Sequence, residues 1–169
     1  MTNLICVRGF TPVIGSDSFI SQTAMIIGDV ITGNHCSFWF NAVIRGDVNS
    51  IRIGDFTNIQ DGAVIHATFE RTTTVIGNYV SVGHNAIVHG CKIGNYVLVG
   101  MGAIVMDDAI IEDYCIIAAG AVVLERTICE SGHLYAGIPA RKIKQLSPEQ
   151  LTSLEKTPVN YILYSSWFI

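Results

Sequence analysis

The stretch VIGNYVSVGHNAIVHGCKIGNYVLVGMGAIV, residues 75–105, decides the fold. An aliphatic residue returns in it every six positions, with one step of five. The same spacing continues beyond the stretch on both sides. Before it, the series is interrupted once, by a step of eleven residues from Ile65 to Ile76. The full series is Ile53, Ile59, Ile65, Ile76, Val82, Val88, Ile93, Val99, Val105, Ile111, Ile117 and Val123. Glycine and Asn or Asp beside these residues suit tight turns between short strands. A fixed short period of this kind predicts an all-β solenoid of coiled parallel strands.

Three six-residue units make one triangular rung, and rungs stack about 4.8 Å apart. We expect this array of rungs to span residues 1–144, and residues 145–169 to form a C-terminal α-helical tail that packs on it or across a subunit interface. Ser147-Pro148-Glu149-Gln150 forms a helix-starting capping box, with Leu146, Leu151 and Leu154 on one apolar face. Pro158 is expected to end or kink that helix.

Composition narrows the class of protein. Half of the 169 residues are hydrophobic and 14% are charged, which excludes disorder. The net charge of -4 argues against a nucleic-acid partner. We find no signal-peptide pattern and no apolar run long enough to cross a membrane. The five cysteines show no CxxC spacing and indicate buried thiols in a reducing compartment, so we expect a cytoplasmic protein.

The rungs place three histidines on faces of the solenoid. If residues 67–75 form a loop at one corner, Ile65 and Val88 occupy the same face one rung apart. His66 and His89 then point outward about 5 Å from each other, a separation that suits two ligands of one metal ion. His84 lies on a different face, from which a neighbouring copy could supply it. This arrangement predicts a site shared between subunits with threefold symmetry.

Three histidines with an open fourth position are typical of catalytic rather than structural zinc. The alternative, three unrelated histidines on a polar surface, is weakened because two of them stack and the third completes the set. His35 and His133 have no such partners, and we interpret both as structural or surface residues.

Three segments closely resemble the γ-class carbonic anhydrases and their homologues: VIRGDVNSIRIGDFTNIQDGAVIHA (43–67), SVGHNAIVHGCKIG (81–94) and LVGMGAIV (98–105). The resemblance covers roughly residues 12–144. It implies a left-handed parallel β-helix, a homotrimer and one zinc, or alternatively iron or cobalt, at each subunit interface. It also implies the ligand division deduced above, with His66 and His89 from one chain and His84 from the next.

Other site residues carry over from the resemblance one at a time. Arg45 and Asp47 match a charged pair that the family places at the interface near the metal. Gln60 matches a glutamine that contacts metal-bound solvent, and Asn58 an asparagine nearby. Tyr135 matches a tyrosine found near the metal in many relatives. From its position on the face of His84, Asp61 is expected to orient a ligand imidazole.

The sequence departs from the family's founding type at two places. Val48 stands where that type has a glutamate after Arg-Gly-Asp, and the loop after His66 is shorter, with Glu70 as its one acid. Glu70 is a candidate proton shuttle, although a loop salt bridge with Arg71 is favoured. We therefore expect a γ-carbonic-anhydrase-like protein in which metal-bound hydroxide hydrates CO2 to bicarbonate weakly or not at all.

Two other classes of function stay open. The first is an acyl-CoA thioesterase or a hexapeptide acyltransferase. The segment Gly-Ile-Pro-Ala-Arg (137–141) resembles the corresponding C-terminal segment of the hexapeptide acyltransferases. A basic groove near Arg141, Lys142 and Lys144 would favour CoA in that case. The second is a non-catalytic trimeric module of a larger complex.

Overall fold

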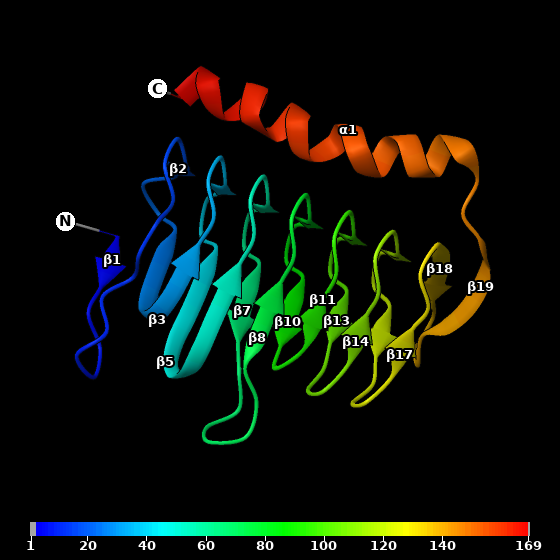
Figure 1. Cartoon of the computed structure of the whole chain (residues 1–169), viewed down its shortest axis with the longest axis horizontal. Helices are drawn as coiled ribbons and strands as arrows, with labels where there is room; N and C mark the ends of the chain where they lie inside the picture. Colours follow the sequence, from blue (N-terminus) through cyan, green and yellow to red (C-terminus); the bar gives the residue numbers. More distant parts are fainter. Residues whose placement is uncertain (1–2, 169) are drawn as a thin grey trace.

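A computed structural model describes residues 3–168. The chain forms a parallel β-solenoid of about 7 turns, and one helix runs back along its outside (Figure 1). The strands are β1 (Leu4–Ile5), β2 (Phe19–Ile20), β3 (Met25–Thr32), β4 (Ser37–Phe38), β5 (Val43–Ile53), β6 (Asn58–Ile59), β7 (Val64–His66), β8 (Thr74–Ile76), β9 (Ser81–Val82), β10 (Ile87–His89), β11 (Lys92–Ile93), β12 (Leu98–Val99), β13 (Ile104–Val105), β14 (Ile110–Ile111), β15 (Ile116–Ile117), β16 (Val122–Val123), β17 (Ile128–Cys129), β18 (His133–Ala136) and β19 (Arg141–Gln145).

Strands pair in parallel with the strands one rung above and below. One face follows β7, β10, β13 and β16, a second follows β8, β11, β14 and β17, and the long strand β5 joins the two. The third face runs from β2 through β9 to β18, where the antiparallel strand β19 pairs with β18. Val88 pairs with Val105, 17 residues further along the chain. Across the loop after β7 the offset is 23 residues, and His66 pairs with His89.

The core is a ladder of inward side chains. Every member of the predicted aliphatic series is buried, from Ile53 at 4% exposed to Val123 at 0%. Alanines and cysteines fill the narrower corners between them, including Ala63, Ala86 and Cys115. The predicted fold class is therefore confirmed, because each rung is stabilised by burying its apolar residues on its neighbours.

One corner of the solenoid carries a ladder of aromatic rings. Phe56, Tyr79, Tyr96 and Tyr114 stack in sequence with centroids 4.7 to 4.8 Å apart and interplanar angles of 2° to 10°. His35 continues the stack above Phe56, at 4.8 Å. Each of these residues has a positive φ of 54° to 56°, which non-glycine residues seldom adopt. Ring stacking along the ladder offsets the strain of these turns.

Helix α1 (Pro148–Ser165) ends in a short 3₁₀ turn, η1 (Ser166–Phe168). It begins with the predicted capping box between Ser147 and Gln150. It does not end at Pro158, which lies inside the helix and is buried. At its far end Tyr161 and Phe168 contact Trp39, with ring centroids 5.4 and 5.8 Å away. These aromatic contacts anchor the helix to the first rungs.

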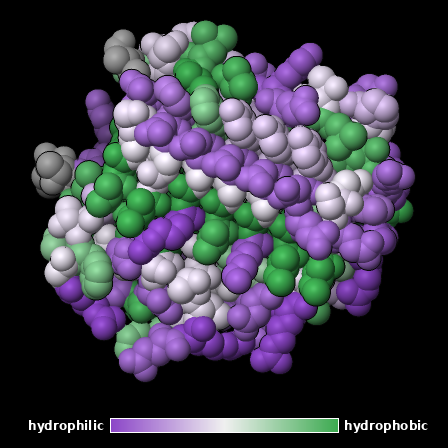
Figure 2. Space-filling model, in the orientation of Figure 1, coloured by the Kyte–Doolittle hydropathy of each residue, from purple (hydrophilic) through white to green (hydrophobic). Residues whose placement is uncertain are grey.

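Apolar side chains gather in a band beside α1, along the length of the solenoid (Figure 2). Among residues 3–168, no helix has the length and apolar character needed to cross a membrane.

All five cysteines are free thiols. Four are buried as expected, whereas Cys6 is exposed, which corrects the expectation of five buried thiols. Burial raises the pKa of the Cys36 and Cys115 thiols to about 11. It raises the pKa of Cys91 and Cys129 to about 12.

Candidate metal centre

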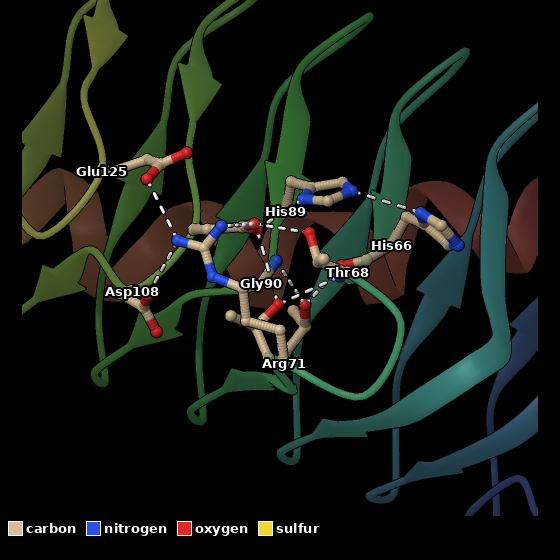
Figure 3. Close-up of polar contacts among 10 residues, drawn as sticks. His66, Thr68, Arg71, His89, Gly90, Asp108 and Glu125 are labelled. Atoms are coloured by element: carbon tan, nitrogen blue, oxygen red, sulfur yellow. Dashed lines mark hydrogen bonds and ion pairs between the residues drawn. The ribbon is translucent and has the colours of Figure 1, made fainter.

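Two histidines stand side by side at the ends of neighbouring strands. His66 ends β7 and His89 ends β10, and the two residues are direct partners in the parallel register. Their rings point toward each other (Figure 3), with Nδ1 of His66 3.2 Å from Nε2 of His89. Because the side chains of a strand alternate in direction, burying Ile65 and Val88 turns both imidazoles outward.

Each of the two imidazoles meets a carboxylate on its other ring nitrogen. Nε2 of His66 lies 3.0 Å from Oδ1 of Asp47 on β5, and Nδ1 of His89 lies 2.6 Å from Oδ1 of Asp107. Arg45 forms an ion pair with Asp47. If each carboxylate accepts the N–H of its histidine, the two facing nitrogens both present lone pairs. That arrangement is favourable only with a proton or a cation between them.

The electrostatics keep His66 neutral and the two carboxylates charged. Burial lowers the pKa of His66 and outweighs the hydrogen bond to Asp47. Burial alone would raise the pKa of Asp47, but hydrogen bonds from Arg45 and His66 hold it below its ordinary value. The pKa of Asp107 is likewise lowered against the effect of burial, by hydrogen bonds from Thr68 and His89. A neutral imidazole beside a carboxylate is the form that binds metals.

The geometry of this pair fits two ligands of one tetrahedral ion. Two nitrogens each about 2.0–2.1 Å from a zinc are about 3.3 Å apart, and the two facing nitrogens here are separated by 3.2 Å. Among residues 3–168, no group of three His, Cys, Asp or Glu side chains is arranged to hold a metal ion. The described part of one chain therefore brings together two candidate metal ligands, His66 and His89.

His84 lies on another face, in the turn after β9. Its Nδ1 lies 2.8 Å from Oδ2 of Asp61, so it too has a carboxylate on one ring nitrogen. The two residues are each about two-fifths exposed in their side chains. A pocket of about 360 Å³ opens beside His84 and is lined mainly by apolar residues, including Leu98, Met101 and Ile116. Gln60 and Tyr161 complete its wall.

The amide of Gln60 is held in place by two neighbours on the same face. Its Nε2 donates to Oδ1 of Asn58 at 3.0 Å, and Nδ2 of Asn58 donates to Oγ of Ser81 at 2.8 Å. Gln60 and Asn58 are 5% and 1% exposed. With Nε2 engaged, the carbonyl oxygen of Gln60 is the end that can accept a hydrogen bond from a hydroxyl or a water.

Tyr135 and Glu70 were also expected at the site, but within residues 3–168 neither makes a hydrogen bond or ion pair with His66, His84 or His89. Tyr135 is buried in the last rung, where it pairs with Ile117, and its hydroxyl accepts a hydrogen bond from the backbone N–H of Glu130 at 2.8 Å. Glu70 is exposed at the tip of the loop. The favoured Glu70–Arg71 salt bridge is not among the ion pairs of residues 3–168. Arg71 instead contacts Glu125 at 3.1 Å and Asp108 at 3.4 Å.

Asp107 is the residue at this centre that the sequence reasoning missed. No local motif marks it, because it lies 18 residues after His89. From β10 to β13 the rung offset is 17 residues, which places Asp107 level with the residue after His89, so the rung offset itself was the signal that could have found it. The same offset brings Asp107 beside Gly90 on the next rung.

Comparisons with known proteins give a consistent family. The family model described as "Bacterial transferase hexapeptide (six repeats)" matches residues 90–125. A probable carbonic anhydrase of Methanocaldococcus jannaschii is 41% identical over 146 residues, which cover 86% of this chain and 91% of the relative. The mitochondrial gamma carbonic anhydrase 2 of Arabidopsis thaliana is 37% identical over 157 residues, or 90% of this chain. The chain spans only 56% of the length of that plant relative.

A solved structure matches along nearly the whole chain. A hexapeptide transferase family protein from Anaplasma phagocytophilum superimposes with a TM-score of 0.94 and 42% sequence identity. The match covers 98% of both chains. The solenoid and its C-terminal helix therefore recur together in a protein described as a transferase.

Proposed function

Because this chain belongs to the γ-class carbonic anhydrase family of hexapeptide-repeat proteins, we propose that it binds a metal ion between two copies of itself and there hydrates CO2 reversibly to bicarbonate. The observation that carries the proposal is the pair of histidine nitrogens 3.2 Å apart, each ring fixed by a carboxylate. His66 and His89 of one copy and His84 of the next would hold the ion. Zinc is the proposed metal, with iron and cobalt as alternatives.

An ion bound there supplies a Lewis acid that makes water acidic near neutral pH. The chain's own residues set the surroundings. Asp47, Asp61 and Asp107 each fix one ring nitrogen of a histidine, which leaves the other nitrogen as a ligand. Gln60, held by Asn58, presents its carbonyl oxygen to orient a hydroxyl or water.

Proton transfer to solvent is the weak step of this proposal. Glu70 is exposed at the loop tip, and Val48 has no group that exchanges protons. We therefore propose that hydration is slow, with Glu70 as the candidate shuttle.

A homotrimer follows from the division of ligands between faces. The face that carries His66 and His89 also presents an apolar outward row, in which Val64, Ile87, Ile104 and Val122 are aligned rung by rung. Ile87 is 36% exposed in the single chain. An apolar row beside half of a metal site indicates a surface that another copy covers.

Subunit mixing tests the shared site directly. His84→Ala and His89→Ala are each expected to lose bound metal and stopped-flow CO2 hydration in the full chain. Trimers assembled from both variants should regain about a quarter of the wild-type sites, because some interfaces then pair an intact His84 with an intact His66 and His89. Mixtures that regain neither metal nor activity would contradict a site shared between copies.

Acyl transfer from CoA is the second candidate. His84 with Asp61 forms a histidine–carboxylate pair that can act as a general base, and the apolar pocket of about 360 Å³ beside it would accept a short acyl chain. That reaction has no need of His89. Thioester cleavage or acyl transfer that survives His89→Ala and is lost in His84→Ala would favour this candidate over CO2 hydration.

A trimer that retains metal but shows neither activity would favour the third function, a non-catalytic module of a larger complex. The five free thiols support a reducing compartment, and we propose the cytoplasm.

A further inference from the structure

Asp107 is an aspartate with 6% exposure, and it lies directly behind His89. Its Oδ1 is 2.6 Å from Nδ1 of His89. Its Oδ2 accepts a hydrogen bond from Oγ1 of Thr68 at 2.5 Å, and Oγ1 of Thr72 lies 3.5 Å from Oδ1. A carboxylate this well buried costs free energy unless its oxygens are hydrogen-bonded, and here both oxygens have partners.

The partners of Asp107 come from the loop that interrupts the six-residue spacing. Thr68 and Thr72 lie between β7 and β8, and the backbone N–H of Thr68 donates to Oγ1 of Thr72 at 3.0 Å. Thr74, at the end of the same insertion, donates to the carbonyl oxygen of His66 and accepts from the backbone N–H of Gly90. In Figure 3 this loop folds beneath the two histidine rings. The insertion therefore touches the backbone of one histidine and the carboxylate of the other.

Arg71 is the competing partner for Asp107. Its guanidinium approaches Oδ2 of Asp107 only to 4.0 Å, while it contacts Glu125 at 3.1 Å, and its side chain is 43% exposed. An exposed ion pair at that distance contributes little. The carboxylate of Asp107 lies 2.6 Å from the ring nitrogen of His89 and 4.0 Å from the guanidinium of Arg71. Its placement therefore serves the imidazole.

We propose that Asp107 is a positioning residue for His89, and that the loop 67–73 holds Asp107 in place through Thr68 and Thr72. The inference rests on the proposed metal site and deepens it. It gives the loop a structural role in ordering a ligand, which differs from the proton-transfer role considered for Glu70. Carboxylates that fix a ligand imidazole typically raise metal affinity 10- to 100-fold.

The test measures metal binding, with Co2+ as the probe because its visible absorption reports coordination. Apo-protein of the full chain is titrated as wild type, Asp107→Asn and Asp107→Ala. We expect affinity to fall by about 10- to 100-fold in Asp107→Ala and less in Asp107→Asn, which retains an acceptor for the N–H of His89. The Co2+ spectrum should change in both variants.

Matched variants separate positioning from general damage. Asp108→Asn removes a neighbouring exposed carboxylate that does not contact His89, and it should bind Co2+ as wild type does. Thr68→Val should weaken binding while Thr68→Ser restores it, because serine keeps the hydroxyl that donates to Asp107. If Asp107→Ala fails to fold, Asp107→Asn and the Thr68 pair still decide the question.

Wild-type affinity and spectrum in Asp107→Asn together with no effect of Thr68→Val would overturn the inference and leave the proposed function intact. An equal loss in Asp108→Asn would also overturn it. Wild-type protein that binds Co2+ but hydrates no CO2 would reject only the proposed function. Wild-type protein that binds no metal would reject both.

Discussion

Gly90 determines how closely Asp107 approaches His89. Its φ is +57°, and a Cβ built there would lie 2.1 Å from Oδ1 of Asp107 and 2.3 Å from Oγ1 of Thr72. Its backbone N–H donates to Oγ1 of Thr74 and to the carbonyl oxygen of His66. A glycine directly after His89 thus leaves the room in which the carboxylate of Asp107 lies against the ring and the hydroxyl of Thr72 lies against the carboxylate.

Gly90→Ala should consequently lower the free energy of unfolding by more than the strain of its left-handed backbone alone. Gly120 is a matched control, because its φ is +67° and nothing lies within 4 Å of the position of a Cβ. We expect Gly120→Ala to lower the free energy of unfolding by about 1 kcal/mol, the cost of left-handed backbone. Gly90→Ala should lose roughly 1–3 kcal/mol more through steric overlap. Urea unfolding measures both, and equal losses would show that the space beside Gly90 is not needed.

Buried thiols make stability depend on alkaline pH. The pKa of Cys36 is raised by burial from 9.0 to about 11, so the thiol stays neutral in the folded chain while it ionises in the unfolded chain. A raised folded-state pKa gives stability that is complete below pH 9 and is lost as the pH rises toward about 11. The loss from Cys36 should be on the order of 2 kcal/mol.

Urea unfolding between pH 8 and pH 11 would measure this loss. Cys36→Val is the control, because valine occupies the equivalent buried position in other rungs, at Val80 and Val97. The variant should lose less stability over that range than wild type. Identical pH profiles for the two proteins would show that the Cys36 thiol does not contribute.

At the scale of the elements, the aromatic ladder of Phe56, Tyr79, Tyr96 and Tyr114 links successive turns at one corner of the solenoid. Tyr96 stacks on Tyr79 and on Tyr114, each with centroids 4.8 Å apart. Tyr96→Ala removes both stacks, each worth about 0.5–1.5 kcal/mol, and should lower the free energy of unfolding by about 1–3 kcal/mol. Tyr96→Phe keeps both rings in contact and should match wild type. Thermal unfolding of the two variants checks the prediction, and an alanine variant as stable as wild type would contradict it.

The rungs were predictable because one rule governs every element. An inward aliphatic residue each six positions fixes the strand, the face and the rung, and it correctly placed His66 opposite His89 across the loop. The helix start was also predictable, because a capping box is a local pattern. Local rules suffice where each interaction recurs at a fixed step along the chain.

The features that were not predicted depend on contacts between distant segments. Pro158 was expected to end or kink the helix. A kink stays a prediction, but the helix does not end there, and Tyr161 and Phe168 beyond it pack on Trp39. Those contacts outweigh the cost of about 3 kcal/mol for an interior proline. Tyr135 was assigned by resemblance, and its burial in the last rung followed from its register with Ile117. Asp107 was accessible to the rung rule but required applying it to polar side chains as well as apolar ones.

At the scale of the whole molecule, one chain presents two unlike halves of the proposed centre on different faces. His66 and His89 lie on the face of β7 and β10, and His84 lies beside β9 in the other sheet. Copies arranged around a threefold axis bring these two unlike faces together at each contact and leave no half of the proposed centre unpaired. Metal binding and assembly should therefore depend on each other, since bound metal stabilises the assembled state by mass action.

Ile87→Asp tests that coupling. Ile87 lies outward on the strand of His89 between Val64 and Ile104, so a carboxylate there would be buried without a partner if another copy covers the row. The variant should sediment as a monomer and lose bound metal, although His66 and His89 both remain. Val75→Asp is the control, because Val75 is similarly exposed, at 38% against 36%, on the face of β8 between Arg52 and Lys92. It should remain trimeric and metal-loaded. Dissociation by Val75→Asp and not by Ile87→Asp would place the subunit contact on a different face and separate the histidines from it. A monomeric wild type would contradict the shared site altogether.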